Sequence, residues 1–291
     1  MPYDKYIVVR VVLLCIKHFT MSNTSLSFVD NIAMRYEELL GPFLFEPFAA
    51  DLEKRVRREP ATNVLELACG TGRLTRRLAA ALAPGATLTA TDISLEMLAV
   101  ARETVGSMAI WWAEADMTAL PFADGEFDLV VAQFGLMFAA DHSKALQEAK
   151  RVLRKGGRLL FNSWAPAAEN PVWIALGQSV RSVLGDGANV PMDQPFSLAD
   201  EGKVLQLMEE NGFHDVTASL VRLTCSIESA AAAAQGMVEG LPVINIIRAR
   251  APQALPKLLE LLEQRYAAAF GDSPMVAPVS ARVFEGRVLL P

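Results

Sequence analysis

The 291-residue sequence has few of the side chains from which disulfide frameworks and metal sites are built. It contains three cysteines, Cys15, Cys69 and Cys225, which lie far apart and form no C-x-x-C pair, and only three histidines. We therefore expect neither a disulfide scaffold nor a zinc site, and we predict no bound metal. This cysteine usage fits a reducing compartment, so we expect a cytoplasmic protein.

Long runs of one kind of side chain are also missing. The apolar run over residues 7–16 is about half the length of a membrane span and is interrupted by Arg10, so no integral membrane span is expected. No Lys and Arg cluster with interleaved aromatics is present and the formal net charge is -6, which argues against nucleic acid as a partner. The polar stretch that begins at Met21 predicts that residues 1–22 are an N-terminal extension, with Met21 as an alternative start.

What the chain does contain is typical of a globular protein. Hydrophobic residues make up 52% and charged residues 21%, so a large core can be buried. We expect N-terminal helices over residues 23–62, a ligand-binding core over 63–165, and lid helices with the last strands over 166–291. A homodimer is left open.

Short apolar runs alternate with helical patterns from residue 64 to residue 161, which is typical of βα units and a mostly parallel sheet. Ser94 and Asp141 are expected to cap helices, and a helix is expected to end at Lys155, Gly156 and Gly157. The expected strands cover residues 64–67, 88–91, 109–113, 127–134, 158–163, 216–224 and 279–290. Further helices are expected over residues 171–184, 198–210, 230–247 and 255–270. The last strand is expected to lie antiparallel to its neighbours.

Three of these strand ends carry residues that suit a nucleoside ligand. Gly70 and Gly72 follow the first strand, where small residues let backbone N–H groups approach a ligand closely. Asp92 comes 20 residues after Gly72 (92 minus 72), at the end of the next strand, where a carboxylate can accept both ribose hydroxyls. Asp116 and Met117 follow the third strand and offer an acceptor for an adenine amino group and an apolar platform.

Each of these residues also has a purely structural interpretation. The glycines could only make a tight turn, and Asp92 could only cap a helix. Cys69 is interpreted as a small packing residue and His142 as a solvated residue beside a helix cap. Arg73, Arg76 and Arg77 are interpreted as a solvated helix face.

The order and spacing of five segments resemble the class I S-adenosylmethionine-dependent methyltransferases, and within them the ubiquinone/menaquinone-biosynthesis-like group that acts on small molecules. The resembling segments are VLELACGTG (64–72), TATDIS (89–94), EADMTALPF (114–122), DGEFDLVVAQFGLMF (124–138) and RVLRKGGRLLFNSW (151–164). The resemblance covers about 100 residues and implies an α/β, Rossmann-like, mostly parallel seven-stranded sheet with helices on both faces and a helical lid.

The resemblance also implies S-adenosyl-L-methionine as the cofactor and a role for each matching residue. The glycine turn would hold the methionine part of the donor, Asp92 its ribose and Asp116 its adenine. Gln133 would lie under the sulfonium, and Tyr36 would close the amino-acid end. The implied donor-binding residues are Tyr36, Glu66, Ala68, Gly70, Gly72, Asp92, Ile93, Met97, Asp116, Met117 and Gln133, with Ile93 and Met97 flanking adenine. Two departures stand out: Glu66 replaces the commoner Asp, and Ala68 replaces the first glycine and should limit how strained the turn can be.

The sequence leaves three functions open. The first is methyl transfer to an oxygen, carbon or nitrogen atom of a small molecule, for which the apolar lid predicts a lipophilic or aromatic acceptor. The second is a non-catalytic S-adenosylmethionine-binding protein, because the transfer needs positioning and exclusion of water rather than a signature nucleophile. The third is an NAD-dependent oxidoreductase, whose G-x-G-x-x-G would need a glycine where Thr75 stands. No residue is predicted to be catalytic.

Overall fold

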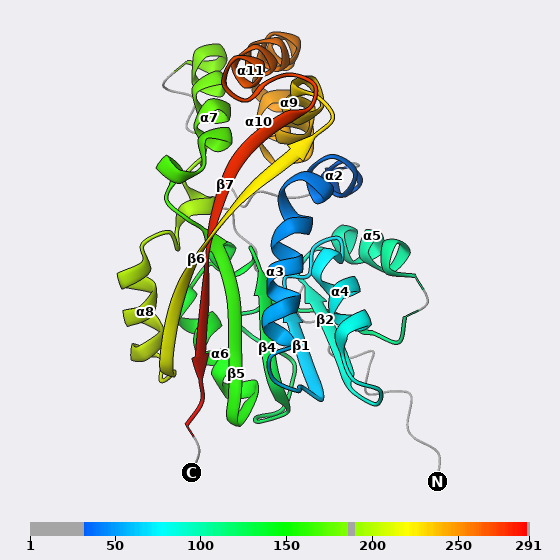
Figure 1. Ribbon diagram of the computed structural model, residues 1–291, viewed down its shortest axis with the longest axis vertical. Coiled ribbons are helices and arrows are strands. Elements are labelled where there is room, and N and C mark those ends of the chain that lie inside the picture. Colours follow the sequence, from blue (N-terminus) through cyan, green and yellow to red (C-terminus); the bar gives the residue numbers. More distant parts are fainter. Residues whose placement is uncertain (1–31, 107, 186–189, 290–291) are drawn as a thin grey trace, which may run out of the picture.

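The computed structural model describes residues 32–106, 108–185 and 190–289 (Figure 1). A single seven-stranded sheet runs through it in the order β3-β2-β1-β4-β5-β7-β6. Its strands are β1 (Asn63–Leu67), β2 (Thr87–Asp92), β3 (Trp111–Glu114), β4 (Phe127–Gln133), β5 (Leu153–Trp164), β6 (His214–Ile227) and β7 (Met275–Arg287). Strands β1 to β5 pair in parallel, and β7 lies antiparallel to both β5 and β6. The expected Rossmann-like sheet with an antiparallel last strand is confirmed.

Helices cover both faces of this sheet and one of its ends (Figure 1). The N-terminal part contains α2 (Ile32–Arg35), the π-helix η1 (Tyr36–Phe45) and α3 (Glu46–Val56). The connections between strands contain α4 (Arg73–Ala81), α5 (Leu95–Val105), η2 (Leu136–Phe138), α6 (His142–Val152), η3 (Ala167–Glu169), η5 (Gln194–Phe196) and α8 (Glu201–Glu210). The lid contains α7 (Pro171–Leu184), α9 (Ala230–Glu239), α10 (Val243–Arg250), η6 (Pro252–Ala254) and α11 (Leu255–Phe270).

The two faces of the sheet follow from the alternation of side chains along β4. Leu129 and Val131 belong to one buried cluster with Leu78 of α4, whereas Val130 belongs to another with Leu146 of α6. Successive side chains of a strand point to opposite faces, so a continuous apolar strand needs a helical layer on each side. β4 is buried over almost its whole length, as expected for a central strand.

The lid stands beyond the carboxyl ends of the parallel strands (Figure 1). Leu258, Leu262 and Tyr266 of α11 are fully buried, and the Tyr266 hydroxyl donates to the Val172 carbonyl of α7 at 2.9 Å. Within residues 32–289, no single helix is long and apolar enough to cross a membrane. Only α9 and α10 taken together meet the length and composition of a span, and they are bent by 77°.

Several predicted boundaries shift by a few residues. The expected end of α6 at the Lys155–Gly157 segment is wrong, because the helix ends at Val152 and Leu153 already pairs with Phe127 of β4. β3, β6, β7 and α8 likewise start or end a few residues away from the predicted positions. The predicted caps are confirmed, since the side chain of Ser94 accepts from the Met97 N–H and that of Asp141 from the Lys144 N–H. The predicted extension over residues 1–22 and the apolar run over 7–16 lie outside the described residues.

Candidate functional site

The turn that joins β1 to α4 brings backbone into the left-handed region three times. Ala68 has φ 49°, Gly70 has φ 56° and Gly72 has φ 85°. A Cβ atom on Gly72 would lie 2.7 Å from Cγ2 of Val105, so this glycine lets the turn pack closely on α5. A Cβ on Gly70 would meet nothing within 4 Å, so open space adjoins the backbone at this point. A ligand can therefore approach the turn at Gly70.

Ala68 does not limit the turn in the way the sequence predicts. It adopts the left-handed conformation despite its Cβ, which costs roughly 1 kcal/mol relative to a glycine. Room for that Cβ comes from the turn after β4, because a side chain on Gly135 would lie 2.5 Å from it. The alanine methyl group is thus packed against the backbone of a neighbouring turn.

Asp92 connects the end of β2 to the glycine turn. Its Oδ2 accepts from the Gly70 N–H at 2.8 Å, and its Oδ1 accepts from the Ser94 N–H at 2.9 Å. The side chain is 8% exposed, and burial raises the pKa of its carboxyl although these N–H groups act in the opposite direction. A carboxylate held in this way has a fixed orientation and keeps lone pairs for further donors.

Glu66 places a second carboxyl group at the same end of the sheet. The residue is almost fully buried, and its Oε2 has no hydrogen-bond partner in the described part of the chain. Burial raises the pKa of Glu66 to about 8, and the nearby Asp92 contributes to that rise, whereas hydrogen bonding from Thr75 lowers it. An unpartnered buried carboxyl oxygen is costly in a folded protein. Glu66 is therefore a candidate to form a hydrogen bond with a bound ligand.

The N-terminal π-helix η1 covers this end of the sheet. The ring of Tyr36 stacks on that of Phe45 with centroids 4.5 Å apart, and burial raises the pKa of the Tyr36 hydroxyl. The Phe45 carbonyl accepts from Nε2 of Gln133 at 2.7 Å, which ties η1 to the end of β4. π-Helical turns are rare and occur frequently at functional sites.

The interpretation of Arg73, Arg76 and Arg77 as a solvated helix face is wrong. The side chain of Arg73 is 16% exposed and forms an ion pair with Glu37 of η1 at 2.7 Å. Arg76 and Arg77 pair with Glu46 at the start of α3. Their helical pattern is polar, but the N-terminal helices pack over this face and supply carboxylates to it.

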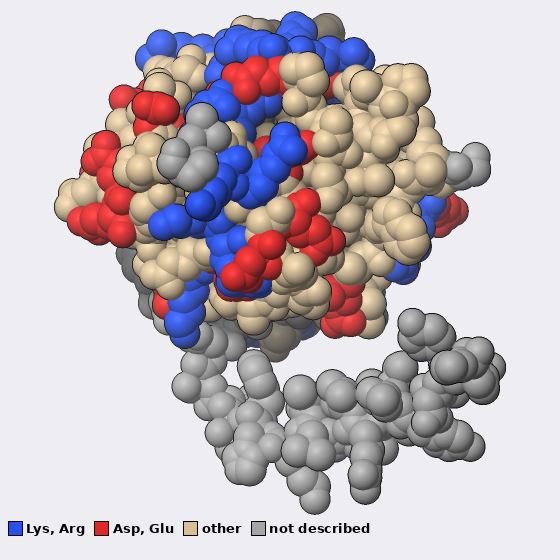
Figure 2. All heavy atoms as spheres, turned by 90° about the horizontal axis from the view of Figure 1, so that it is seen from below, with Lys and Arg blue, Asp and Glu red and all other residues tan. Residues whose placement is uncertain are grey.

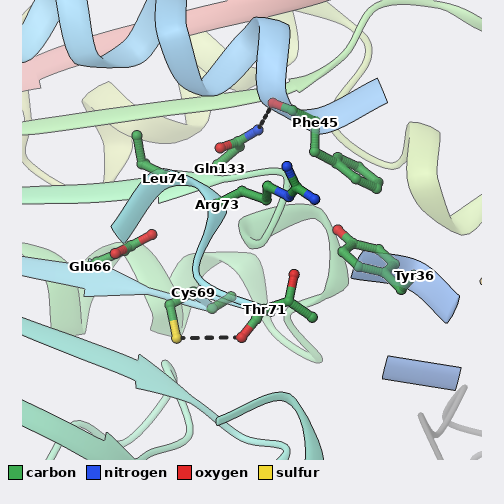
Figure 3. A pocket seen from close by; sticks show the side chains of 10 residues that line it. Tyr36, Phe45, Glu66, Cys69, Thr71, Arg73, Leu74 and Gln133 are labelled. Atoms are coloured by element: carbon green, nitrogen blue, oxygen red, sulfur yellow. Dashed lines mark hydrogen bonds between the residues drawn. The ribbon is translucent and has the colours of Figure 1, made fainter. Parts of the chain in front are cut away.

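These elements enclose a small pocket with about 300 Å³ of empty space, part of it continuous with solvent (Figure 3). The lining residues are Tyr36, Phe45, Glu66, Ala68, Cys69, Gly70, Thr71, Arg73, Leu74 and Gln133. Five predicted site residues thus come together here, and Gly72 and Asp92 contact the same turn. The other five lining residues, which are Phe45, Cys69, Thr71, Arg73 and Leu74, were not predicted as site residues. The only sequence signal for Thr71 and Arg73 is their position within and directly after the glycine turn.

The remaining predicted residues lie outside this pocket. Ile93 is 66% exposed next to Asp92, whereas Met97 is 4% exposed and is buried with Ala33 of α2. The Oδ1 atom of Asp116 accepts from both the N–H and the hydroxyl of Thr118. The Ala115 N–H donates to the Asp92 carbonyl at 3.0 Å, so the Asp116 turn is tied to the Asp92 strand end. The proposed contacts of these residues with adenine stay predictions.

The turn after β4 carries an aromatic cluster that the sequence analysis did not predict. Phe134 has φ 51°, and its N–H donates to Oδ1 of Asn162 at 2.8 Å. Its ring stacks on Trp164 with centroids 4.0 Å apart, and Trp164 lies 5.7 Å from Trp173 of the lid. The cluster extends from the pocket residue Phe45 toward the lid and consists of aromatic rings.

The other groups that could take part in chemistry are possible metal ligands, Cys69 and His142. No group of three or more His, Cys, Asp and Glu in the described ranges could hold a metal ion. Cys69 is buried, and burial raises the pKa of its thiol well above the usual value, in keeping with a packing role. His142 is half-buried, with Nε2 3.5 Å from the Met137 carbonyl. On the end of the molecule opposite to the lid, basic and acidic side chains are intermixed (Figure 2).

Parts of this chain match known proteins in sequence. Residues 65–161 match the model of a family described as "Methyltransferase domain". An uncharacterised protein of Mycobacterium tuberculosis is 41% identical over 128 residues, which is 43% of this chain and 46% of the relative. A demethylmenaquinone methyltransferase of Thermus thermophilus is 41% identical over 145 residues, which is 47% of this chain and 64% of the relative. The matches thus span about half to two thirds of the length of these relatives.

A solved structure extends the likeness beyond these segments. The Haemonchus contortus phosphoethanolamine N-methyltransferase 2, in complex with S-adenosyl-L-methionine, superposes with a TM-score of 0.56 over 90% of this chain and 58% of its own. The sequence identity is 16%, so this likeness concerns the fold. Because it covers 90% of this chain, the likeness reaches well beyond residues 65–161.

Proposed function

We propose that this chain, in which residues 65–161 form a class I, S-adenosylmethionine-dependent methyltransferase domain, transfers the donor's methyl group to a small apolar or aromatic molecule. The observation that carries the proposal is the connection between Asp92 and the glycine turn. Oδ2 of Asp92 accepts from the Gly70 N–H, so the ribose-binding candidate and the backbone that faces open space form one rigid unit.

The residues present fit such a donor. The open space beside Gly70 suits close approach by a ligand, and the unpartnered Oε2 of Glu66 suits a hydrogen bond with a polar group of that ligand. When bound, S-adenosylmethionine supplies an electrophilic methyl group on a sulfonium. Asp92 would hold the ribose hydroxyls, and Gln133, anchored through Phe45, would lie beside the sulfonium.

The protein's contribution to the reaction is positioning and exclusion of water. The π-helix η1 covers the pocket through Tyr36 and Phe45, and the ring of Phe45 also contacts Phe134 and Trp164 of the aromatic cluster. An acceptor that lies against this cluster would be shielded from water and held in line with the methyl group. This arrangement favours a flat, apolar acceptor over a small polar one.

The acceptor class that we favour is a hydroquinone or a related phenol. The aromatic cluster supports a ring-shaped acceptor, and the Thermus thermophilus relative is a demethylmenaquinone methyltransferase. Methyl transfer to an oxygen or carbon of such a ring requires loss of a proton, for which a base or an ionised acceptor is needed.

The proposal is tested by incubating the protein with S-adenosylmethionine labelled in the methyl group and a panel of acceptors. The panel contains reduced naphthoquinones, simple phenols and primary amines, and the product is detected by mass. We expect label in the hydroquinones and phenols. Label in amines alone would disprove the acceptor class, and saturable binding of NAD without binding of S-adenosylmethionine would disprove the donor.

The non-catalytic alternative has a specific observation in its favour, which is that Glu66 and Tyr36, two ionisable groups of the pocket lining, are both assigned to the donor and leave no carboxylate for the proton of an acceptor. Cys69 has a raised pKa, and neither Thr71 nor Gln133 ionises. An acceptor that is already ionised or is an amine would not need such a base. Donor binding without methylation of any panel member or metabolite extract would favour this alternative.

A further inference from the structure

A second hollow lies between α7 and α11 of the lid and shares no lining residue with the pocket beside the glycine turn. It has about 640 Å³ of empty space, much of it continuous with solvent. Its lining residues are Gln178, Arg181 and Ser182 of α7 and Arg265 of α11. All four are polar and two are cations, so the chemistry of this hollow differs from that of the aromatic cluster below the lid.

The positive charge in the hollow is not balanced by a carboxylate. α7 contains Arg181 and no acidic residue, and the two acids of α11, Glu260 and Glu263, are not among the lining residues. Neither Arg181 nor Arg265 forms an ion pair with a described residue. By contrast, Arg282 of β7 pairs with two glutamates. An anion in the hollow would supply the missing negative charge.

Arg265 is held in place by neutral groups of the neighbouring helix. Its Nη1 donates to Oε1 of Gln178 at 3.0 Å, and its Nη2 donates to Oγ of Ser182 at 3.3 Å. The Ser182 hydroxyl itself donates to the Gln178 carbonyl at 2.8 Å, which leaves its oxygen free to accept. A guanidinium has five N–H groups, so three of them (five minus two) have no partner among the described residues. The group is thus ordered while its charge stays uncompensated, which lowers the entropic cost of binding an anion.

Arg181 and Gln178 add further donors from α7. A Cβ atom on Gly177 would lie 3.6 Å from Nη1 of Arg181, so this guanidinium lies along the helix at a residue without a side chain. Its N–H groups have no partner among residues 32–106, 108–185 and 190–289. The amide oxygen of Gln178 is used by Arg265, so its amide N–H groups remain as donors. Three side chains from two helices therefore offer donors, which suits the several oxygens of a phosphate better than the two of a carboxylate.

We propose that the hollow between α7 and α11 binds a phosphate group, with Arg181 and Arg265 as its two cationic ligands. The phosphate belongs either to a soluble compound or to the headgroup of a phospholipid, because both present the same oxygens to the guanidinium groups. This site goes beyond the proposed function and does not depend on methyl transfer. A phosphate held by both arginines would connect two helices of the lid.

The test measures binding of inorganic phosphate by calorimetry at constant ionic strength. The proteins compared are the wild type, Arg181→Met, Arg265→Met and the control Arg248→Met. Arg248 is an exposed arginine of the lid helix α10 that does not line the hollow, so the control removes the same charge. We expect dissociation constants on the order of 1 mM for the wild type and the control. Arg181→Met and Arg265→Met should each bind at least about tenfold more weakly, as for loss of a hydrogen bond to a charged group.

Vesicles distinguish the two sources of the phosphate. The protein is sedimented with vesicles of phosphatidylcholine alone and with vesicles that contain about one quarter phosphatidylglycerol. Sedimentation with the second kind only, lost in Arg181→Met and kept in Arg248→Met, would support the site and assign it to a lipid headgroup. Binding of inorganic phosphate without sedimentation would support the site and assign it to a soluble compound.

Two outcomes would overturn the proposal. One is a wild type that binds neither inorganic phosphate nor the vesicles with phosphatidylglycerol. The other is equal weakening in Arg181→Met and Arg248→Met, which would show attraction by overall charge and no defined site. The Arg181 side chain is exposed and has no partner among the described residues, so Arg181→Met should fold even where Arg265→Met loses the link between α7 and α11.

Discussion

The turn after β1 and the turn after β4 lie next to each other at the carboxyl end of the sheet, yet they consist of different types of residue. The first consists of small residues and exposes backbone to open space, and its anchors are the carboxylates of Asp92 and Glu37. The second holds Phe134 in a left-handed conformation by means of Asn162 and presents stacked rings. The difference teaches that neighbouring strand ends can play opposite parts, since the first leaves backbone beside open space and the second contributes rings to the buried core.

The largest predicted effect is a loss of ligand affinity on removing the carboxylate that anchors the polar turn after β1. Asp92→Ala removes the acceptor of the Gly70 and Ser94 N–H groups and the proposed ribose ligand, so we expect the affinity for S-adenosylhomocysteine to fall by about 100-fold. Calorimetry measures this loss.

Asp141→Ala is the matched control, because the Asp141 carboxylate also accepts from a backbone N–H but lies after the apolar turn. Both variants should lose about 1 kcal/mol of stability, because each removes a carboxylate that accepts from backbone N–H groups, and only Asp92→Ala should lose donor affinity. Similar affinity losses in both would refute the assignment of Asp92 to the donor.

The second prediction concerns the contact between the two turns. Gly135→Ala places a methyl group 2.5 Å from Cβ of Ala68, so we expect the free energy of unfolding to fall by about 2 kcal/mol. Adding Ala68→Gly should restore most of this loss, since it removes the opposing methyl group and the left-handed strain together. Urea denaturation of the single and double variants measures the coupling.

Gly177→Ala in α7 is the control for adding a methyl group, because a Cβ there would meet only Nη1 of Arg181, at 3.6 Å. It should be neutral or stabilise the helix by up to about 1 kcal/mol. Strictly additive effects of the Gly135 and Ala68 substitutions would mean that the two turns are not coupled through this contact.

The smallest predicted effect is a change in the pH dependence of the free energy of unfolding, which should arise beside the polar turn after β1 and not beside the apolar turn after β4. Burial raises the pKa of Glu66 to about 8 from the usual 4.5, so between these values Glu66 is protonated in the folded protein and ionised in the unfolded one. The unfolded state then binds fewer protons, and the free energy of unfolding decreases as pH rises through this window. Glu66→Gln removes the group, and we expect a shallower decrease between pH 5.5 and 7.5 in urea denaturation.

Asp92 shifts in the same direction and stays in this variant, so some pH dependence should remain. The control is Asn162→Ala on the apolar side, which should lower stability by about 1 to 3 kcal/mol at every pH because it leaves the Phe134 N–H without its acceptor. A slope unchanged by Glu66→Gln would show that the carboxyl group is ionised in the folded protein.

Much of the fold and half of the candidate site could be predicted because the signals are local. A cap such as Ser94 acts on an N–H three residues away, and β4 reveals its central position by its continuous apolar run. The strand ends at Gly70 and Asp92 meet because parallel neighbouring strands end at the same edge. The aromatic side gave no such signal, since Phe134 and Trp164 are 30 residues apart (164 minus 134), one in the turn after β4 and the other at the end of β5.

By itself, therefore, the sequence determined the alternation of strands and helices, the glycine turn and the acid that follows the next strand, because all of these depend on spacing along the chain. Only the tertiary structure decided what covers that turn. From the sequence alone, the polar face of α4 is interpreted as solvated. In the structure, Glu37 and Glu46 of the N-terminal helices pack over it. Such partners are set by packing between segments some 30 residues apart, and no periodicity within one helix carries that information.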